Sequence, residues 1–184
     1  MSPMLSMIFF IKLYKKKDLK PFMNIAFTFL GIIYVALPFA LLIAMAMRSG
    51  TYNMEIVIGC LFLLWASDIG GYFAGTKFGK RKLFERISPK KSWEGVIGSF
   101  LFAGIVALGL GHYFNTYEPW MWYCIGAIMV VAGIYGDLVE SLFKRSIAIK
   151  DSGNTIPGHG GFLDRFDGLL LSMPFIITFI KLFS

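Results

Sequence analysis

The sequence predicts an all-α polytopic membrane protein with about five spanning helices and a partial helix at the N-terminus. The chain of 184 residues is 57% hydrophobic and only 16% charged, whereas a typical soluble domain is about 25% charged. It contains several uncharged runs of roughly the 20 residues that a helix needs to cross a bilayer. Its basic residues gather between alternate runs, as in membrane proteins. This composition disfavours a free-standing soluble domain, a disordered chain, collagen and a coiled coil.

The predicted elements follow from the position of the uncharged runs. Residues 1–11 are apolar but too short to cross, and the basic segment follows them, so they predict a partial helix and not a signal peptide. The predicted spans are Phe22–Met47 with a tilt or kink at Pro38, Ile56–Thr76 interrupted by Asp68, Gly95–Tyr117, Pro119–Gly136, and the marginal Gly168–Ser184. We therefore expect residues 1–21 to form a partial helix with a basic segment, and residues 22–184 to form one membrane domain.

The basic residues predict the orientation of these spans. If residues 12–20 lie inside, every Lys and Arg except Arg48 and Lys181 falls on the same, cytoplasmic side. The net charge of +7 would indicate nucleic acid in a soluble protein. In so apolar a chain it indicates contact with anionic lipid or nucleotide, and no nucleic-acid partner is expected.

Charged residues inside or beside the spans require an explanation, because a carboxylate at the bilayer centre costs about 2.5–3.5 kcal/mol. Asp137, Glu140, Ser141 and Lys144 share one face at the cytoplasmic end of the fourth predicted helix. The alternative for this group is a Glu140–Lys144 pair that only secures the helix end. Asp68 must find a cation, a donor or a ligand.

Asp68 also shares its helix face with a ladder of glycines, Gly71, Gly75 and Gly79. This spacing favours close helix packing over chemistry.

Two basic segments could bind phosphate. Ser88, Lys90, Lys91 and Ser92 precede a predicted helix start, where backbone N–H groups bind anions, although basic residues beside a span often only set topology. Residues 144–167 combine Lys144, Arg145, Lys150 and Arg165 with the glycine-rich run 158–161. The alternative for the second segment is a solvated cytoplasmic loop.

Carboxylates in the second segment predict a magnesium site. Asp164 and Asp167 lie three residues apart at the start of the last helix, and Asp137 could reach them from the neighbouring helix. Mg²⁺ typically uses one or two carboxylates together with substrate phosphates. His159 could orient a phosphate or act as acid or base, or could be an ordinary loop histidine. Together these residues indicate phosphoryl or nucleotidyl transfer.

The same residues resemble a known family. The motif is Ser141-Leu142-Phe143-Lys144-Arg145, then after four residues Lys150-Asp151-Ser152-Gly153, then IPGHGGFLDRFD at 156–167. It resembles the phosphatidate cytidylyltransferase family, also called CDP-diacylglycerol synthases. The family pattern is also similar at residues 67–72, at Gly75, at residues 78–80 and at residues 88–95, with Ser92 where threonine is more usual and Gly71 where alanine is more usual.

The resemblance implies a phospholipid-biosynthetic enzyme that joins CTP and phosphatidate into CDP-diacylglycerol and releases pyrophosphate. It implies Mg²⁺, with K⁺ in some members, membrane lipid as surroundings, a homodimer as one assembly, and a bacterial inner membrane with the site facing the cytoplasm. Expected catalytic residues are Asp137, Lys144, Arg145, Lys150, Asp151, His159 and Arg165. Expected substrate-binding residues are Asp68, Ser88, Lys90, Lys91, Ser92, Glu140 and Ser141, and expected metal ligands are Asp137, Asp164 and Asp167.

Other functions remain open at this stage. A CTP-dependent lipid kinase of the polyprenol or phytol type would transfer the γ-phosphoryl group instead. Because family members usually carry additional N-terminal helices, a truncated and inactive membrane protein, or one that only binds nucleotide or lipid, is a second alternative. An ion-coupled transporter would also place carboxylates in its spans, but it would not need so many basic residues beside them.

Overall fold

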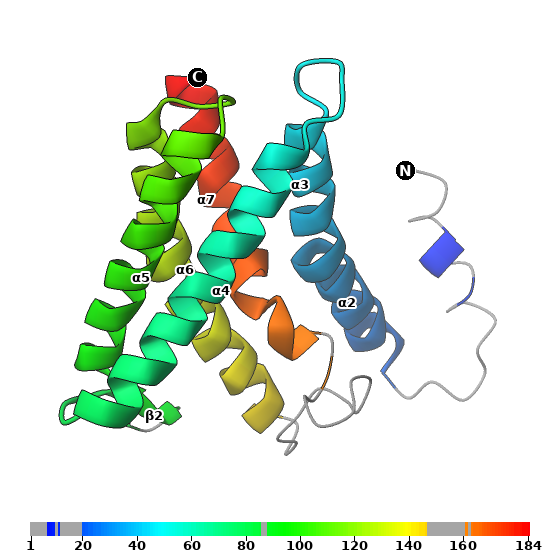
Figure 1. Cartoon of the computed structure of the whole chain (residues 1–184). Coiled ribbons are helices and arrows are strands. Elements are labelled where there is room, and N and C mark those ends of the chain that lie inside the picture. Colours follow the sequence, from blue (N-terminus) through cyan, green and yellow to red (C-terminus); the bar gives the residue numbers. More distant parts are fainter. Residues whose placement is uncertain (1–6, 10, 12–19, 86–87, 147–160, 162) are drawn as a thin grey trace. The chain divides into compact units, whose positions relative to one another are not determined.

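The structure is a computed structural model that describes residues 7–9, 11, 20–85, 88–146, 161 and 163–184 (Figure 1). Three predicted site residues, Lys150, Asp151 and His159, lie outside the described residues. The chain divides into two units, residues 1–37 and residues 38–184. This boundary differs from the one expected after residue 21, and that expected division stays a prediction.

The first unit contains helix α2 (Pro21–Gly31) and the π-helical segment η1 (Ile32–Ala36). Residues 7–9 and 11, in the region of the expected partial helix, are helical. Pro21 stands in the first turn of α2, where its missing N–H costs no helical hydrogen bond. In η1 the Leu37 N–H donates to the carbonyl of Ile32, five residues back. A local change in helical hydrogen bonding therefore immediately precedes Pro38, which cannot donate a backbone hydrogen bond itself.

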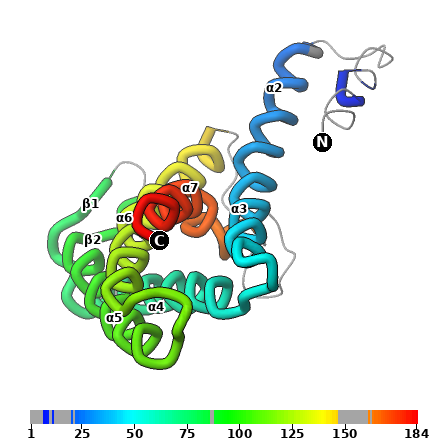
Figure 2. Tube along the Cα trace, turned by 90° about the horizontal axis from the view of Figure 1, so that it is seen from above, coloured from blue at the N-terminus to red at the C-terminus, as the bar shows by residue number. Residues whose placement is uncertain are grey.

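The second unit contains all the other elements. After α3 (Leu37–Ala46), whose residues from Pro38 onward belong to this unit, they are α4 (Met54–Phe78), β1 (Lys82–Phe84), β2 (Ser88–Ser92), α5 (Trp93–Tyr113), α6 (Pro119–Ser146), the 3-10 turn η2 (Leu163–Arg165) and α7 (Asp167–Phe183). Helix α4 packs mainly on α5 and α7 mainly on α6, while α5 and α6 join the two pairs (Figure 2). Fully buried side chains such as Leu63, Trp122, Met129 and Met173 form the core between them.

Small residues allow α4 and α5 to approach closely. A Cβ atom on Gly70 would overlap the carbonyl oxygen of Gly98, and one on Gly71 would lie 2.7 Å from Ser99 Oγ. The Ser99 hydroxyl donates to the carbonyl of Ser67 at 2.7 Å across the same contact. The prediction that the glycine ladder packs against another helix is confirmed for Gly71 and Gly75, both of which face α5.

The β1–β2 hairpin is an element that the sequence analysis did not predict. Lys82 pairs with Ser92 and Phe84 with Ser88 in an antiparallel register. The Glu94 carboxylate in the first turn of α5 accepts hydrogen bonds from the backbone N–H groups of Lys80 and Arg81 at 3.1–3.2 Å. This contact brings the end of α4 back to the start of α5 and closes the hairpin. The fold remains all-α, as predicted.

Four described helices are long and apolar enough to cross a bilayer: Phe22–Ala46, Met54–Phe78, Trp93–Tyr113 and Pro119–Ser146. On α5, Ile97, Leu101, Ile105 and Leu108 form an exposed apolar stripe, as expected of a surface that faces lipid. The chain is therefore a membrane protein. Helix α7 has 17 residues, fewer than the roughly 20 that a perpendicular crossing needs, so the fifth span stays a prediction.

The second unit has two chemically different ends. The hairpin, the C-terminal end of α6 and the start of α7 lie together at one end, whereas the turn between α3 and α4 and the C-terminus lie at the other (Figure 1). The hairpin end holds the described basic residues of residues 77–85, 88–91, 144–146 and 163–165. Arg48 lies at the opposite end, where it donates to the Ser184 carbonyl at 3.1 Å, and Lys181 lies in the last turn of α7. For the described residues of the second unit, this separation agrees with the predicted distribution of charge, while the cytoplasmic orientation stays a prediction.

Candidate active site

A cavity of about 450 Å³ lies at the hairpin end of the second unit, within the range of small-molecule sites. It is bounded by α4, the hairpin, the start of α5, the last turns of α6, η2 and the start of α7. The predicted site residues that line it are Asp68, Ser88, Lys90, Lys91, Ser92, Asp137, Glu140, Lys144, Asp164, Arg165 and Asp167. Residues separated by up to 99 positions in the sequence, Asp68 and Asp167, therefore meet at one site.

Two predicted residues in the described part of α6 do not line the cavity. The Ser141 hydroxyl donates to Asp137 Oδ1 at 3.3 Å, so Ser141 acts on the site by orienting that carboxylate. Arg145 is exposed at the end of α6 and is not among the lining residues. A role for Arg145 in binding phosphate stays a prediction, as do the roles of Lys150, Asp151 and His159.

Three carboxylates form a cluster inside the cavity. Oxygen atoms of Asp137, Glu140 and Asp167 lie within 4.8 Å of one another. Glu140 is 2% exposed, and among the described residues neither of its carboxylate oxygens accepts a hydrogen bond. A buried carboxylate without a hydrogen-bond donor is unfavourable unless a cation compensates it, and the ammonium group that pairs with Glu140, Lys144 Nζ at 3.4 Å, is shared with Asp164. The cluster therefore fits a hard divalent cation, which prefers carboxylate oxygen ligands.

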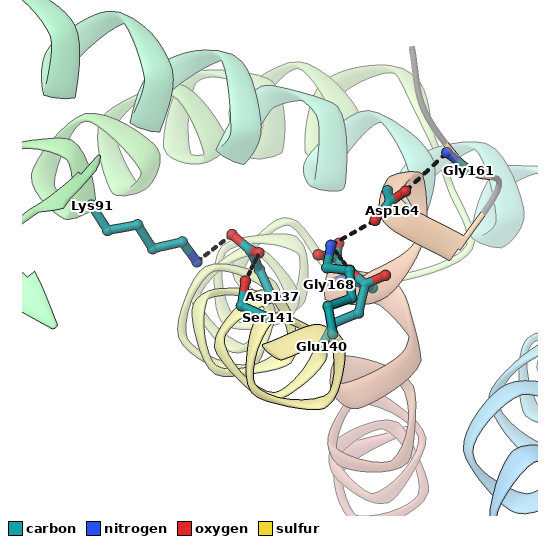
Figure 3. Close-up of polar contacts among 9 residues, drawn as sticks. Lys91, Asp137, Glu140, Ser141, Gly161, Asp164 and Gly168 are labelled. Carbon is teal, nitrogen blue, oxygen red and sulfur yellow. Dashed lines mark hydrogen bonds and ion pairs between the residues drawn. The ribbon is translucent and has the colours of Figure 1, made fainter. Parts of the chain in front are cut away.

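Asp164 lies beside this cluster and has other partners. Its Oδ1 atom is 2.6 Å from Lys144 Nζ, and its Oδ2 atom accepts a hydrogen bond from the Gly161 N–H at 2.9 Å (Figure 3). Lys144 Nζ also lies 3.4 Å from Glu140 Oε2, which links Asp164 to the cluster through the ammonium group. The structure thus groups Glu140, and not Asp164, with Asp137 and Asp167. The predicted ligand role of Asp164 stays a prediction.

Close contact between α6 and the start of α7 brings the carboxylates together. A Cβ atom on Gly136 would lie 2.5 Å from the carbonyl oxygen of Asp167, and one on Gly168 would lie 3.3 Å from Gly133 Cα. Only glycine leaves enough space at such a crossing. Gly136 directly precedes Asp137, and the Gly168 N–H donates to the Asp167 carboxylate at 2.6 Å. The two helices therefore approach most closely where they present their aspartates.

The hairpin contributes a cation to the same site. Lys91 extends from β2 to α6, where Nζ lies 2.6 Å from Asp137 Oδ2 and donates to the carbonyl of Ile134 at 3.1 Å (Figure 3). Lys90, Lys144 and Arg165 also line the cavity. The Ser92 side chain caps α5 by accepting a hydrogen bond from Gly95 N at 3.2 Å. Carboxylates and cations thus share one space, an arrangement suited to a metal-bound polyphosphate.

The sequence analysis assigned no role to Ser67, Tyr72 or Ser99, although all three line the cavity. Tyr72 follows Asp68 by four residues, so both project from the same face of α4. This spacing of four residues is visible in the sequence, and it could have identified Tyr72 as a residue of the same site as Asp68. Ser67 and Ser99 form part of the α4–α5 contact, which is visible only in the tertiary structure.

Replacing Lys144 by Met is expected to destabilise the protein by roughly 1.5–3 kcal/mol, because the Asp164 and Glu140 carboxylates then lose their shared cation. Thermal unfolding in detergent, followed by tryptophan fluorescence, measures this effect. The matched control is Lys181→Met, since Lys181 is exposed near the end of α7. Equal melting temperatures of the two variants would contradict the prediction.

The sequence of the chain is similar to those of several bacterial phosphatidate cytidylyltransferases. It is 42% identical to the phosphatidate cytidylyltransferase of Haemophilus influenzae over 133 residues, which cover 70% of this chain and 46% of the relative. It is 37% identical to the phosphatidate cytidylyltransferase of Bacillus subtilis over 169 residues, which cover 91% of this chain and 62% of the relative. It is 46% identical to that of Pseudomonas aeruginosa over 121 residues, which cover 65% of this chain and 45% of the relative. The chain thus spans about half the length of these curated relatives.

The match extends beyond individual relatives. The sequence model of the cytidylyltransferase family matches residues 1–183, which include every element described above. The cavity, with its carboxylate cluster and its lysines, lies within this matched region. From the extent of this match, the chain belongs to the cytidylyltransferase family.

Proposed function

We propose that this chain transfers the cytidylyl group of CTP to phosphatidate, giving CDP-diacylglycerol and pyrophosphate, at the cytoplasmic face of a bacterial inner membrane. The observation that carries the proposal is the cavity in which three carboxylates and several cationic side chains meet. The substrates are inferred from the relatives, which are phosphatidate cytidylyltransferases. The basic residues at the hairpin end support the cytoplasmic orientation. The homodimer implied by the resemblance stays a prediction.

The reaction is an exchange of one phosphoanhydride bond for another. An oxygen of the phosphatidate phosphate attacks the α-phosphorus of CTP. The bond from that phosphorus to the oxygen bridging the β-phosphorus breaks, and pyrophosphate leaves with the bonding electrons. Negative charge accumulates on the phosphate oxygens in the transition state, so catalysis needs positioning and positive charge instead of a covalent enzyme intermediate.

Asp137, Glu140 and Asp167 would hold Mg²⁺ in this proposal. When bound, Mg²⁺ would neutralise charge on the phosphate oxygens. Glu140 supports this assignment because it is buried beside two other carboxylates, and the ammonium group of Lys144, 3.4 Å from its Oε2 atom, is shared with Asp164. Ser141 keeps the Asp137 carboxylate oriented, and the Gly168 N–H does the same for Asp167. The K⁺ implied by the resemblance stays a prediction.

The cationic side chains would bind the two phosphate-bearing substrates. Lys90 and Lys91 approach from the hairpin, while Lys144 and Arg165 approach from α6 and η2. The capped start of α5 lies on the same cavity wall, and backbone N–H groups at a helix N-terminus favour anions. Asp68 and Tyr72 line the cavity from α4 and are available to the nucleoside or the lipid headgroup.

The decisive experiment asks which phosphorus of CTP enters lipid. The purified chain is incubated in nanodiscs with phosphatidate, Mg²⁺ and CTP labelled at either the α or the γ phosphorus. We expect the α label in CDP-diacylglycerol and the γ label in pyrophosphate. This measurement tests the chain itself, which matters because the chain spans only part of each relative.

The other outcomes each identify an alternative. The γ label alone in lipid would contradict the proposal and indicate a CTP-dependent lipid kinase. No label in lipid, with the full-length Bacillus subtilis relative as a positive control, would indicate that this chain does not catalyse the transfer. The Asp167→Asn variant serves as the negative control, because it removes a carboxylate of the cluster.

A further inference from the structure

Lys91 lies between the hairpin and the carboxylate cluster. It belongs to β2, but its ammonium group reaches α6, where it lies 2.6 Å from Asp137 Oδ2 and donates to the carbonyl of Ile134 at 3.1 Å. Its charge also acts on Asp68 of α4. Its side chain is 22% exposed and lines the cavity. Asp137 is also one of the three clustered carboxylates. One carboxylate therefore belongs both to an ion pair and to the candidate cation site.

These two roles of Asp137 oppose each other. An ammonium group 2.6 Å from Oδ2 neutralises the carboxylate and repels a second cation at short range. Ser141 already donates to the other oxygen, Oδ1. Each carboxylate oxygen keeps a second lone pair, so Asp137 can still offer a ligand atom. A divalent cation held by Asp137, Glu140 and Asp167 is nevertheless repelled by the ammonium group of Lys91, and binds more tightly when that group moves away from Asp137.

The cavity offers Lys91 a second partner when a triphosphate is present. Lys90 and Ser88 from the same strand, together with Ser92, line the adjoining wall, so anionic groups are favoured there. A lysine ammonium on its flexible four-carbon stem can change partners without moving the backbone. Arg165 and Lys144 also line the cavity, and Lys144 forms an ion pair with Asp164 at 2.6 Å.

We propose that Lys91 couples cation binding to nucleotide binding, by exchanging the Asp137 carboxylate for a phosphate oxygen of the nucleotide. The inference rests on the proposed function and extends it to the order and cooperativity of binding. Without nucleotide, Lys91 lowers the affinity of the carboxylate cluster for divalent cations. With nucleotide, the ammonium group binds phosphate and the cluster becomes available. Because such coupling is reciprocal, the divalent cation also strengthens nucleotide binding.

The test measures binding of Mn²⁺ alone, by the electron paramagnetic resonance signal of free Mn²⁺, to the full chain in nanodiscs. We expect Lys91→Met to bind Mn²⁺ about five-fold or more tightly than the unsubstituted protein. The matched control is Lys82→Met, which removes the same charge from the same hairpin at a residue that does not line the cavity. It should leave the affinity unchanged.

A second titration adds a CTP analogue with a methylene group between the α and β phosphorus atoms. The analogue should strengthen Mn²⁺ binding to the unsubstituted protein by a larger factor than it strengthens binding to the Lys91→Met variant. If Lys91→Met does not fold, Lys91→Gln replaces it, because the amide still donates to the Ile134 carbonyl but carries no charge.

The outcomes separate this inference from the proposed function. Mn²⁺ affinity of Lys91→Met or Lys91→Gln equal to or weaker than that of the unsubstituted protein would overturn the coupling, while Mn²⁺ binding that Asp167→Asn abolishes would still support the cation site. Equal tightening in Lys82→Met would also overturn it, since the effect would then be a general charge effect. If Mn²⁺ bound neither to the unsubstituted protein nor to any of the Lys91 or Lys82 variants, both proposals would be contradicted.

Discussion

Replacing Asp167 by Asn is expected to lower cytidylyl transfer by about 100-fold or more, which is the scale at which preorganised charge contributes to catalysis. The substitution keeps the shape of the side chain but removes one of three clustered carboxylates. Turnover is measured with the α-labelled CTP assay at saturating Mg²⁺. The amide oxygen still accepts a hydrogen bond from the Gly168 N–H, so the start of α7 should remain folded.

The matched control for this prediction is Glu118→Gln, an equivalent change at an exposed residue just before α6, away from the cavity. It should leave turnover within about two-fold, because surface substitutions away from special features have small effects. If Asp167→Asn retained normal Mg²⁺-dependent turnover, the assignment of the cluster as the cation site would be wrong. A parallel loss in both variants would instead indicate a general effect of removing charge.

Replacing Gly136 by Ala is expected to destabilise the protein by about 1–3 kcal/mol and to reduce turnover at least ten-fold. The added Cβ atom would meet the Asp167 carbonyl oxygen at 2.5 Å and the Asp167 carbonyl carbon at 3.2 Å. Both are backbone atoms, so the start of α7 must move, and Asp167 moves with it. Thermal unfolding in detergent and the α-label assay measure the two effects.

Gly104→Ala is the matched control, because a Cβ atom at this position on α5 would meet nothing within 4 Å. Alanine in a helix interior is favoured over glycine by about 0.5–1 kcal/mol, so this variant should be slightly stabilised and fully active. Normal stability and turnover in Gly136→Ala would show that the contact between α6 and α7 does not position Asp167.

Much of the architecture could be predicted from local sequence features. The uncharged runs predicted α4, α5 and α6, because a backbone in hydrocarbon must satisfy its own hydrogen bonds and therefore forms helices. The glycine spacing after Asp68 predicted a close helix contact, which α5 provides at Gly71. Both the uncharged runs and the glycine spacing lie within a single helix, so the sequence of one segment is sufficient to predict them.

The β1–β2 hairpin could not be predicted from local sequence features. Strand β2 reads Ser88-Pro89-Lys90-Lys91-Ser92, which has neither the β-branched residues nor the alternation typical of a strand. It pairs with β1, and Glu94 from the following helix accepts hydrogen bonds from the N–H groups of Lys80 and Arg81 just before β1. The contact between Glu94 and residues 80–81 forms only in the folded chain, so strand propensity does not predict it.

Local sequence features were sufficient to predict the class of the protein and most of the residues that line the cavity. The spacing of Asp137, Glu140 and Lys144 placed them on one helix face, and the motif in residues 141–167 indicated the family. The tertiary structure decided which carboxylates meet: Glu140 joins Asp137 and Asp167, whereas Asp164 pairs with Lys144. It also decided that Lys91 reaches Asp137. Helical periodicity specifies neighbours within one segment, but the partners across segments depend on how closely the backbones approach, here at Gly136 and Gly168.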